Sequence, residues 1–212
     1  MRTRCRADRG RPSLRRSILF WQAWVYLGVS LTAGVTLIAY LRRTDPALLK
    51  RRLRGLGSEK ETSQKLIQLA AAMILAGTIV VGSLDHRFSW SHVPVVATIA
   101  GCALLVFGYL IIFLSLRENT FAAVNVAVES GQKVISTGPY AVVRHPYYVG
   151  LLVWILATPL ALGSWWGLLM LAPMVLVIAS RIRYEERFLN EHLRGYPAYC
   201  ESLRYRIVPL IW

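Results

Sequence analysis

A polar, turn-rich segment at residues 131–150 holds the residue types best suited to chemistry, and it reads GQKVISTGPYAVVRHPYYVG. Pro146 predicts the start of a helix, because proline fits a first turn whose N–H groups are unpaired anyway. The free N–H groups and positive dipole end of that helix favour an anion such as a carboxylate. Tyr140, Tyr147 and Tyr148 offer flat faces and polar tips that suit a purine or a ribose. An interfacial aromatic belt next to a helix-starting proline would show the same sequence pattern. A ligand site and a purely structural belt therefore both stay open here.

A second group of candidate residues lies at 181–189, RIRYEERFL, where the last apolar stretch ends. Arg181 and Glu185 are four residues apart and share one face of a helix. A solvated helix end with ordinary ion pairs is the commonest fate of such a run. If the last two apolar stretches form a hairpin, however, Glu185 returns beside His145 and Pro146. The helix start and Glu185 would then lie side by side at the membrane boundary. A ligand that carries both a carboxylate and a positive charge would fit there, with its carboxylate at the helix start and its ammonium or sulfonium at Glu185.

The third group is the Leu-Arg-Glu-Asn run at residues 116–119, at the end of an earlier apolar stretch. By itself it predicts a polar cap on a membrane span. It gains interest because the predicted topology places it on the same membrane face as the other two groups. Glu118 is therefore a candidate catalytic residue, and Asn119 is a candidate substrate contact.

The composition indicates a membrane protein. Hydrophobic residues make up 55% of the chain and charged residues 17%, while 25 Lys and Arg against 11 Asp and Glu give a net charge of +14. A soluble domain this apolar would struggle to cover its surface with polar groups, whereas a membrane span needs no such cover. The basic residues lie between the apolar runs, which favours anchoring at a membrane surface over nucleic-acid binding.

The cysteines and histidines predict neither a disulfide framework nor a metal site. Their spacings match no ligand motif, since Cys5, Cys102 and Cys200 lie far apart and His86, His92, His145 and His192 are scattered as well. We therefore expect no metal.

Five apolar stretches organise the chain, at residues 18–41, 66–84, 93–116, 148–160 and 165–179. A membrane span needs about 20 residues at about 1.5 Å each, so the first three can cross alone. The last two are short and predict a tight helical hairpin. The expected fold is an all-α, polytopic membrane helical bundle of about five transmembrane helices. Small residues inside the stretches predict close helix packing, notably Gly77, Gly82, Gly101 and Gly108.

This pattern divides the chain into an Arg-rich segment at 1–17, three transmembrane helices with a basic loop at 18–116, and a core with the candidate site, the hairpin and a tail at 117–212. Lys and Arg number eight in residues 42–65, three in 117–147 and six in the tail after the fifth stretch. The positive-inside rule places these three segments in the cytosol.

The N-terminus conflicts with this topology, because five spans would put its seven arginines on the opposite side. Three explanations stay open: the first stretch does not fully cross, later helices dominate the topology, or the start is longer than the natural one. A signal peptide is a poorer interpretation, since the apolar core is too long and no small-residue cleavage site follows cleanly.

The order of three motifs resembles the isoprenylcysteine carboxyl methyltransferase family. These motifs are GPYAVVRHPYYVG, then YEERFL about 35 residues later, then GYPAYCESLRYRIVP. That family lies within a wider group of membrane methyltransferases that includes phospholipid N-methyltransferases. The similar region runs from about residue 116 onward, and the DPALLKRRL and DHRFSW stretches are similar to those of bacterial members.

The resemblance implies methyl transfer from S-adenosylmethionine without a Rossmann domain, and no G-x-G-x-x-G motif is present. Carried over to this sequence, the cofactor residues would be Gln132, Lys133, Val134, Ile135, Tyr140, His145, Pro146, Tyr147, Tyr148 and Glu185. Arg181 would bind the substrate's carboxylate, and Asn125 is a further candidate contact. Gln132 departs from the His that the family often has there.

The methyl acceptor is left open by these residues. Methyl transfer is an in-line displacement at a sulfonium carbon, so the protein mainly aligns the reactants and removes water. A carboxylate arrives ionised and needs only a cation such as Arg181. An amine or a thiol must lose a proton, for which Glu118 is the candidate base. We expect carboxyl O-methylation of an isoprenylcysteine-like or other lipid-linked carboxylate, with phospholipid amines and small apolar thiols as alternative acceptors.

A non-enzymatic membrane transporter or assembly protein is the alternative from a different class. Transporters commonly show inverted repeats and helices broken at the midplane. Neither is evident, and the charged groups lie at the interface instead. The expected location is a bacterial inner membrane with the active site facing the cytosol, and the expected partners are membrane lipids and a lipophilic substrate.

Overall fold

The computed structural model describes residues 20–55, 61–122, 124, 128, 131–209 and 211–212. Its helices in chain order are α2 (Trp21–Thr44), α3 (Pro46–Gly55), α4 (Thr62–Phe88), α5 (Val95–Glu118), the 3-10 turn η1 (Gly138–Ala141), α6 (Pro146–Ala161), the 3-10 turn η2 (Trp166–Met170), α7 (Leu171–His192) and α8 (Tyr196–Ser202). No strand occurs among the described residues, so the all-α prediction is confirmed. The Arg-rich segment 1–17 and Asn125 lie outside these residues.

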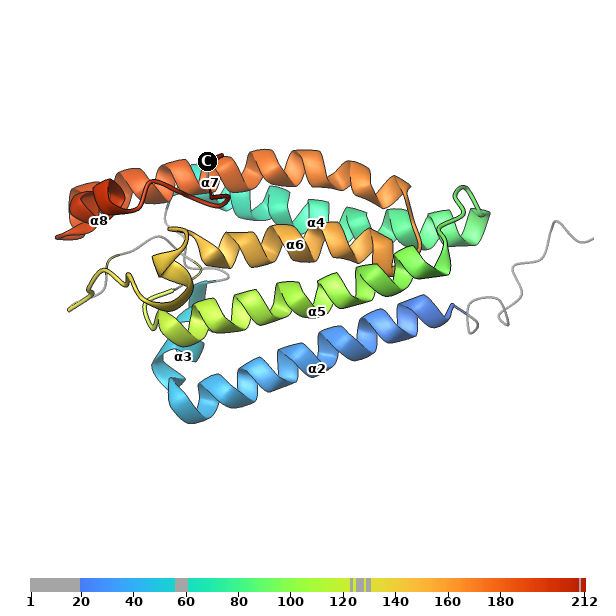
Figure 1. The fold of residues 1–212 in the computed structure, drawn as a ribbon, viewed down its shortest axis with the longest axis horizontal. Helices are drawn as coiled ribbons and strands as arrows, with labels where there is room; N and C mark the ends of the chain where they lie inside the picture. Colours follow the sequence, from blue (N-terminus) through green and yellow to red (C-terminus); the bar gives the residue numbers. More distant parts are fainter. Residues whose placement is uncertain (1–19, 56–60, 123, 125–127, 129–130, 210) are drawn as a thin grey trace, which may run out of the picture.

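Within the described part of the chain, four helical stretches are long and apolar enough to cross a membrane, namely α2, α4, α5 and Trp166–His192, which joins η2 and α7. The helix of the fourth apolar stretch, α6, has 16 residues. At about 1.5 Å per residue it is shorter than a hydrocarbon layer of about 30 Å. It runs inside the bundle beside α5 and α4 (Figure 1). Large apolar side chains are exposed on the surface of the bundle, for example Val96 at 78% and Leu176 at 69%. Such a surface suits contact with lipid rather than with water.

The closest packing in the bundle joins α5 to α6. A Cβ added at Gly101 would lie 2.5 Å from the Ala161 backbone nitrogen, and one at Gly108 would lie 3.0 Å from that of Trp154. The prediction of close packing is confirmed at both glycines, because any larger side chain would push the two backbones apart. At Gly77 the nearest atom would be 3.7 Å away, which is ordinary contact.

Helix boundaries differ from the predicted stretches where the chain leaves the apolar layer. The fifth apolar stretch ends at residue 179, whereas α7 continues to His192 and carries Arg181 and Glu185 on a helix, as predicted. Its polar half, RIRYEERFLNEH, consists of good helix formers, so the helix outlasts its apolar run. Within the predicted basic loop, α3 forms a short helix whose Leu48 is fully buried while Lys50 is exposed. The sequence analysis missed α3, because it treated the basic segment as a loop.

One end of the bundle gathers the polar segments. In Figure 1 α3, the start of α6, the end of α7 and α8 lie at the left end, while the α4–α5 and α6–α7 connections lie at the right end. The described parts of segments 42–65 and 117–147 and of the tail therefore share one end, as the predicted topology required. That this end faces the cytosol stays a prediction.

The opposite end is fastened by the buried carboxylate of Asp85. Its Oδ1 accepts a hydrogen bond from Ser91 N at 2.8 Å, and its Oδ2 accepts one from Ser164 Oγ at 2.5 Å. Ser164 belongs to the turn between α6 and α7, where Gly163 has a φ of +70°. Asp85 thereby ties the α4–α5 loop to the turn of the predicted hairpin, and it positions α6 and α7 from the far end.

Candidate active site

A cavity of about 260 Å³ opens among the polar segments. Small-molecule sites commonly occupy about 300–1,000 Å³, so this cavity is close to the lower end of that range. Its mouth is lined by Asn119, by residues 132–135, by polar residues of α3, η1, α7 and α8, and by the start of α6. Its inner part is apolar and lies between α4, α6 and α7, where it is lined by Ile67, Ala71, Leu151, Met174, Val177 and Ile178. One space thus joins a polar mouth to an apolar interior.

Most of the predicted site residues line this cavity. They are Gln132, Lys133, Val134, Ile135, Tyr140, His145, Tyr147, Tyr148, Glu185, Arg181 and Asn119. Pro146 does not, because it is fully buried in the first turn of α6. Its predicted place at the helix start is nevertheless correct, so it shapes the site through the backbone.

Glu118 has a different position from the one expected of a catalytic base. Its carboxylate accepts a hydrogen bond from Thr137 Oγ1. A Cβ at Gly138, whose φ is +56°, would lie 3.1 Å from Glu118 Oε2. Glu118 thus holds the start of η1, and it is not among the described residues that line the cavity. The base role predicted for it gains no support from this geometry.

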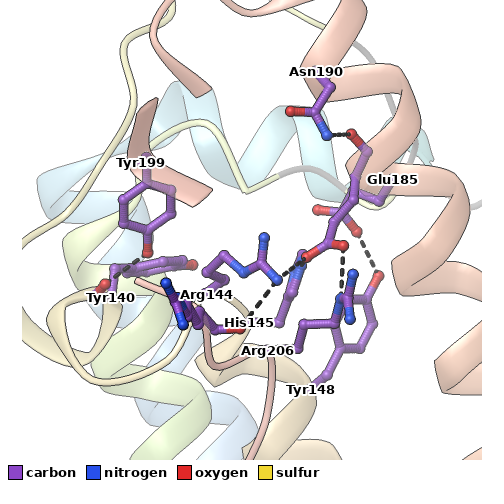
Figure 2. A network of polar contacts seen from close by, with 10 residues as sticks. Tyr140, Arg144, His145, Tyr148, Glu185, Asn190, Tyr199 and Arg206 are labelled. Atoms are coloured by element: carbon purple, nitrogen blue, oxygen red, sulfur yellow. Dashed lines mark hydrogen bonds and ion pairs between the residues drawn. The ribbon is translucent and has the colours of Figure 1, made fainter. Parts of the chain in front are cut away.

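The predicted meeting of the two hairpin helices occurs at Tyr148 and Glu185. The Tyr148 hydroxyl of α6 donates to Glu185 Oε2 of α7 at 2.9 Å, and Figure 2 shows the two side chains facing each other. Glu185 is half-buried at the cavity wall. The hairpin therefore brings Glu185 to the first turn of α6 as predicted, but its contact is Tyr148, and the carboxylate beside His145 is Glu186 instead.

A second carboxylate, Glu186, was missed by the sequence analysis. Its Oε1 lies 3.2 Å from both Arg144 Nη2 and His145 Nε2, and its Oε2 accepts a hydrogen bond from Arg206 Nε at 2.7 Å. Figure 2 shows Arg144, His145 and Arg206 converging at this point. Glu186 is 6% exposed, and two guanidinium groups compensate its buried charge. His145 is the N-cap of α6, so Glu186 lies beside the helix start and contacts it through the His145 imidazole.

Arg181 is held rigidly where it lines the cavity. It is 7% exposed, its Nη1 donates to Gln64 Oε1, and its Nη2 donates to Val124 O at 2.7 Å. Gln64 lies in the first turn of α4 and is 1% exposed. The sequence contains no clear sign of this role, because Gln64 stands among other polar residues at the start of α4. The guanidinium is thus fixed by groups from two other segments.

Arg52 of α3 is a further cavity residue that the sequence analysis missed. Its Nη2 donates to the Tyr147 hydroxyl oxygen at 2.8 Å, and its Nη1 donates to Ala122 O at 3.0 Å. The guanidinium carbon also lies 4.9 Å from the centroid of the Tyr147 ring. Arg52 stands in a run of basic residues, and nothing in that run distinguished it from its neighbours.

Buried tyrosines form the wall toward η1 and α8. The Tyr199 hydroxyl donates to Tyr140 O at 2.6 Å. Burial raises the pKa of Tyr140 and raises the pKa of Tyr199 to about 12, so both phenols stay neutral at physiological pH. The Tyr196 hydroxyl and the Gln68 amide nitrogen are buried and line the cavity without a hydrogen-bond partner among the described residues. An unmet buried group costs about 1–3 kcal/mol, so both fit a polar ligand in this space.

Comparison with known proteins agrees with this site. Residues 96–195 match the family PEMT, phospholipid methyltransferase. Over 116 residues the chain is 31% identical to the Protein-S-isoprenylcysteine O-methyltransferase of Saccharomyces cerevisiae, a match that covers 49% of this chain and 45% of that protein. The chain is thus similar to isoprenylcysteine and phospholipid methyltransferases over about half of its length. The resemblance predicted from the motifs is thereby confirmed, while the bacterial type stays a prediction.

A second similar protein is named for a different activity. Over 129 residues the chain is 28% identical to the Delta(14)-sterol reductase TM7SF2 of Mus musculus, and the match covers 52% of this chain and 30% of that protein. The chain spans less than half the length of either curated relative. The family match runs from the start of α5 to the end of α7 and the turn that follows it, and it includes most of the cavity wall.

Proposed function

We propose that this chain is an S-adenosylmethionine-dependent methyltransferase that acts at the cytosolic membrane face on a lipophilic acceptor, preferentially a lipid-linked carboxylate. The observation that carries the proposal is that one cavity combines two environments. Glu185 lies at its polar mouth, and its interior is apolar. A cationic, water-soluble cofactor fits the mouth, and a lipid chain fits the interior.

The residues at the mouth fit S-adenosylmethionine chemically. Tyr140, Tyr147 and Tyr148 offer aromatic faces for the adenine, and Glu185 offers a negative charge for the ammonium or sulfonium. The segment 132–135 and the Tyr196 hydroxyl add polar contacts along the same wall. When bound, the cofactor supplies an electrophilic methyl group, which passes to the acceptor and leaves a neutral thioether.

The chain's own residues would align the acceptor and exclude water. The Arg181 guanidinium, fixed by Gln64 and Val124, would bind the acceptor's carboxylate beside the cofactor. A carboxylate is ionised at neutral pH and needs no base. An amine or thiol acceptor would need one, and Glu118 points to η1 instead. These contacts favour a carboxylate over a phospholipid amine or a thiol.

The sterol reductase among the relatives supports a competing proposal, the reduction of a lipophilic double bond in the same cavity. A reduction needs an electron donor, whereas methyl transfer needs a methyl donor. The fixed Glu185 carboxylate suits a sulfonium, so methyl transfer is the stronger proposal.

Labelled methyl transfer tests the proposed function. The purified chain in lipid nanodiscs is incubated with methyl-labelled S-adenosylmethionine and a total lipid extract. We expect label in one lipid fraction and its release by mild base, because a methyl ester hydrolyses. Label that resists base would indicate an amine or thioether product, and no transfer to any lipid would contradict the proposal.

A further inference from the structure

Arg52 is a half-buried cavity residue whose partners are all neutral. Its guanidinium contacts the Tyr147 hydroxyl, the Tyr147 ring and the Ala122 carbonyl. None of the ion pairs among the described residues includes it. Long basic side chains are seldom withdrawn from water without an anion, and a guanidinium is well shaped to bind a carboxylate with two parallel hydrogen bonds.

The other cations of the cavity differ from Arg52 in exposure or in contacts. Lys133 lines the cavity with an exposed side chain. Arg144 is paired with the buried Glu186 at 3.2 Å. Arg181 donates to Gln64 in the first turn of α4 and to the Val124 carbonyl, and it is the residue proposed above for the acceptor's carboxylate. At the start of α6, the imidazole of the N-cap residue His145 already contacts the Glu186 carboxylate. Arg52 is therefore the arginine of the cavity that is left for a ligand carboxylate at the mouth.

The surroundings of Arg52 indicate which ligand would supply that carboxylate. The Tyr147 ring beneath Arg52 lies 5.8 Å from the Tyr148 ring, centroid to centroid. The Tyr148 hydroxyl in turn binds Glu185 at 2.9 Å. A cation and an anion thus flank one pair of tyrosines, and an amino-acid end with a carboxylate and an ammonium has the complementary charges.

We propose that Arg52, carried by α3, is the anion-binding residue of this cavity and takes the carboxylate of the bound cofactor. The inference rests on the proposed function and deepens it. It also gives α3 a role, since this helix places Arg52 at the mouth of the cavity although α3 lies outside the matched region 96–195.

Binding of two ligands to the purified full chain in detergent tests the inference. The ligands are S-adenosylmethionine and its decarboxylated analogue, measured by calorimetry on the wild type, Arg52→Gln, Arg52→Lys and Arg54→Gln. Loss of a charge-assisted contact should weaken S-adenosylmethionine binding to Arg52→Gln about 10- to 100-fold. The analogue's affinity should change less than about twofold, and Arg52→Lys should recover part of the loss. Arg54 is an exposed arginine of the same helix, so Arg54→Gln should bind both ligands as the wild type does.

Three results would overturn the inference. Arg52→Gln could bind S-adenosylmethionine as tightly as the wild type, or it could weaken both ligands equally, which would indicate a general distortion. It could also keep its cofactor affinity and lose only the binding of a carboxylate acceptor, for which N-acetyl-S-farnesylcysteine is the probe. A wild type that binds neither ligand would remove the proposed function as well, whereas unchanged Arg52→Gln affinity would remove the inference alone.

Discussion

Arg206 Nε donates to Glu186 Oε2 at 2.7 Å, and this contact joins the C-terminal segment to the wall of the cavity. Glu186 in turn binds Arg144 and His145, whose backbone N–H groups donate to the carbonyls of Tyr205 and Arg206 at 2.9 Å. Arg206 is not among the described residues that line the cavity. It therefore acts on a ligand only through neighbours, as a positioning residue.

Replacing Arg206 with Gln should weaken cofactor binding about tenfold, because a hydrogen bond between charged groups is worth about 1.5–3 kcal/mol. The measurement is a double-mutant cycle of cofactor affinity with Glu186→Gln. If Arg206 acts through Glu186, the double variant should bind no more weakly than Glu186→Gln alone. Additive losses would contradict this role. Arg204, whose side chain is exposed and whose carbonyl alone contacts Arg144, supplies the control Arg204→Gln, which should bind normally.

Replacing Gln64 with Leu should raise the KM for a carboxylate acceptor about 10- to 100-fold, because it releases the Arg181 guanidinium from α4. Cofactor affinity should stay within about twofold, since Gln64 is not among the described lining residues. Steady-state kinetics with a lipid-linked carboxylate check the split. Lys65→Gln, an exposed neighbour on α4, is the control. Equal losses in cofactor and acceptor binding would show that Gln64 supports the whole site instead.

Replacing Gly101 with Ala should destabilise the bundle, because the new Cβ would lie 2.5 Å from the Ala161 backbone nitrogen. Overpacking of this kind costs about 1–3 kcal/mol. The apparent Tm in detergent should fall by at least about 3 °C. Gly34→Ala in α2 is the matched control, since a Cβ there would meet nothing within 4 Å. Equal Tm values for both variants would contradict the tight α5–α6 contact.

The sequence predicted those features that depend on one segment at a time. Apolar run length placed the spans, and the hairpin followed from two short runs, so the approach of Glu185 to α6 could be anticipated. The partners of Arg181 and Glu186 could not, because Gln64 and Arg206 lie far from them along the chain. Glu185 and Glu186 are adjacent in sequence, and only the rotation of α7 sends one to Tyr148 and the other to Arg206.

Arg52 shows the same limit for a single charge in a basic run. Composition predicted that the segment 42–65 would lie at a membrane surface, and it does carry the surface helix α3. Which of its basic residues reaches the cavity depends on how α3 packs through the buried Leu48 against its neighbours. That information resides in the tertiary contacts and not in the charge pattern.

The central claim is that the cavity binds S-adenosylmethionine through Glu185, and the most direct test is the Kd of the purified chain in detergent. The account predicts saturable binding by the wild type, binding weakened at least about tenfold in Glu185→Gln, and wild-type binding in Glu191→Gln, an exposed glutamate of the same helix. Absence of binding by the wild type, or equal affinity of Glu185→Gln and Glu191→Gln, would contradict it.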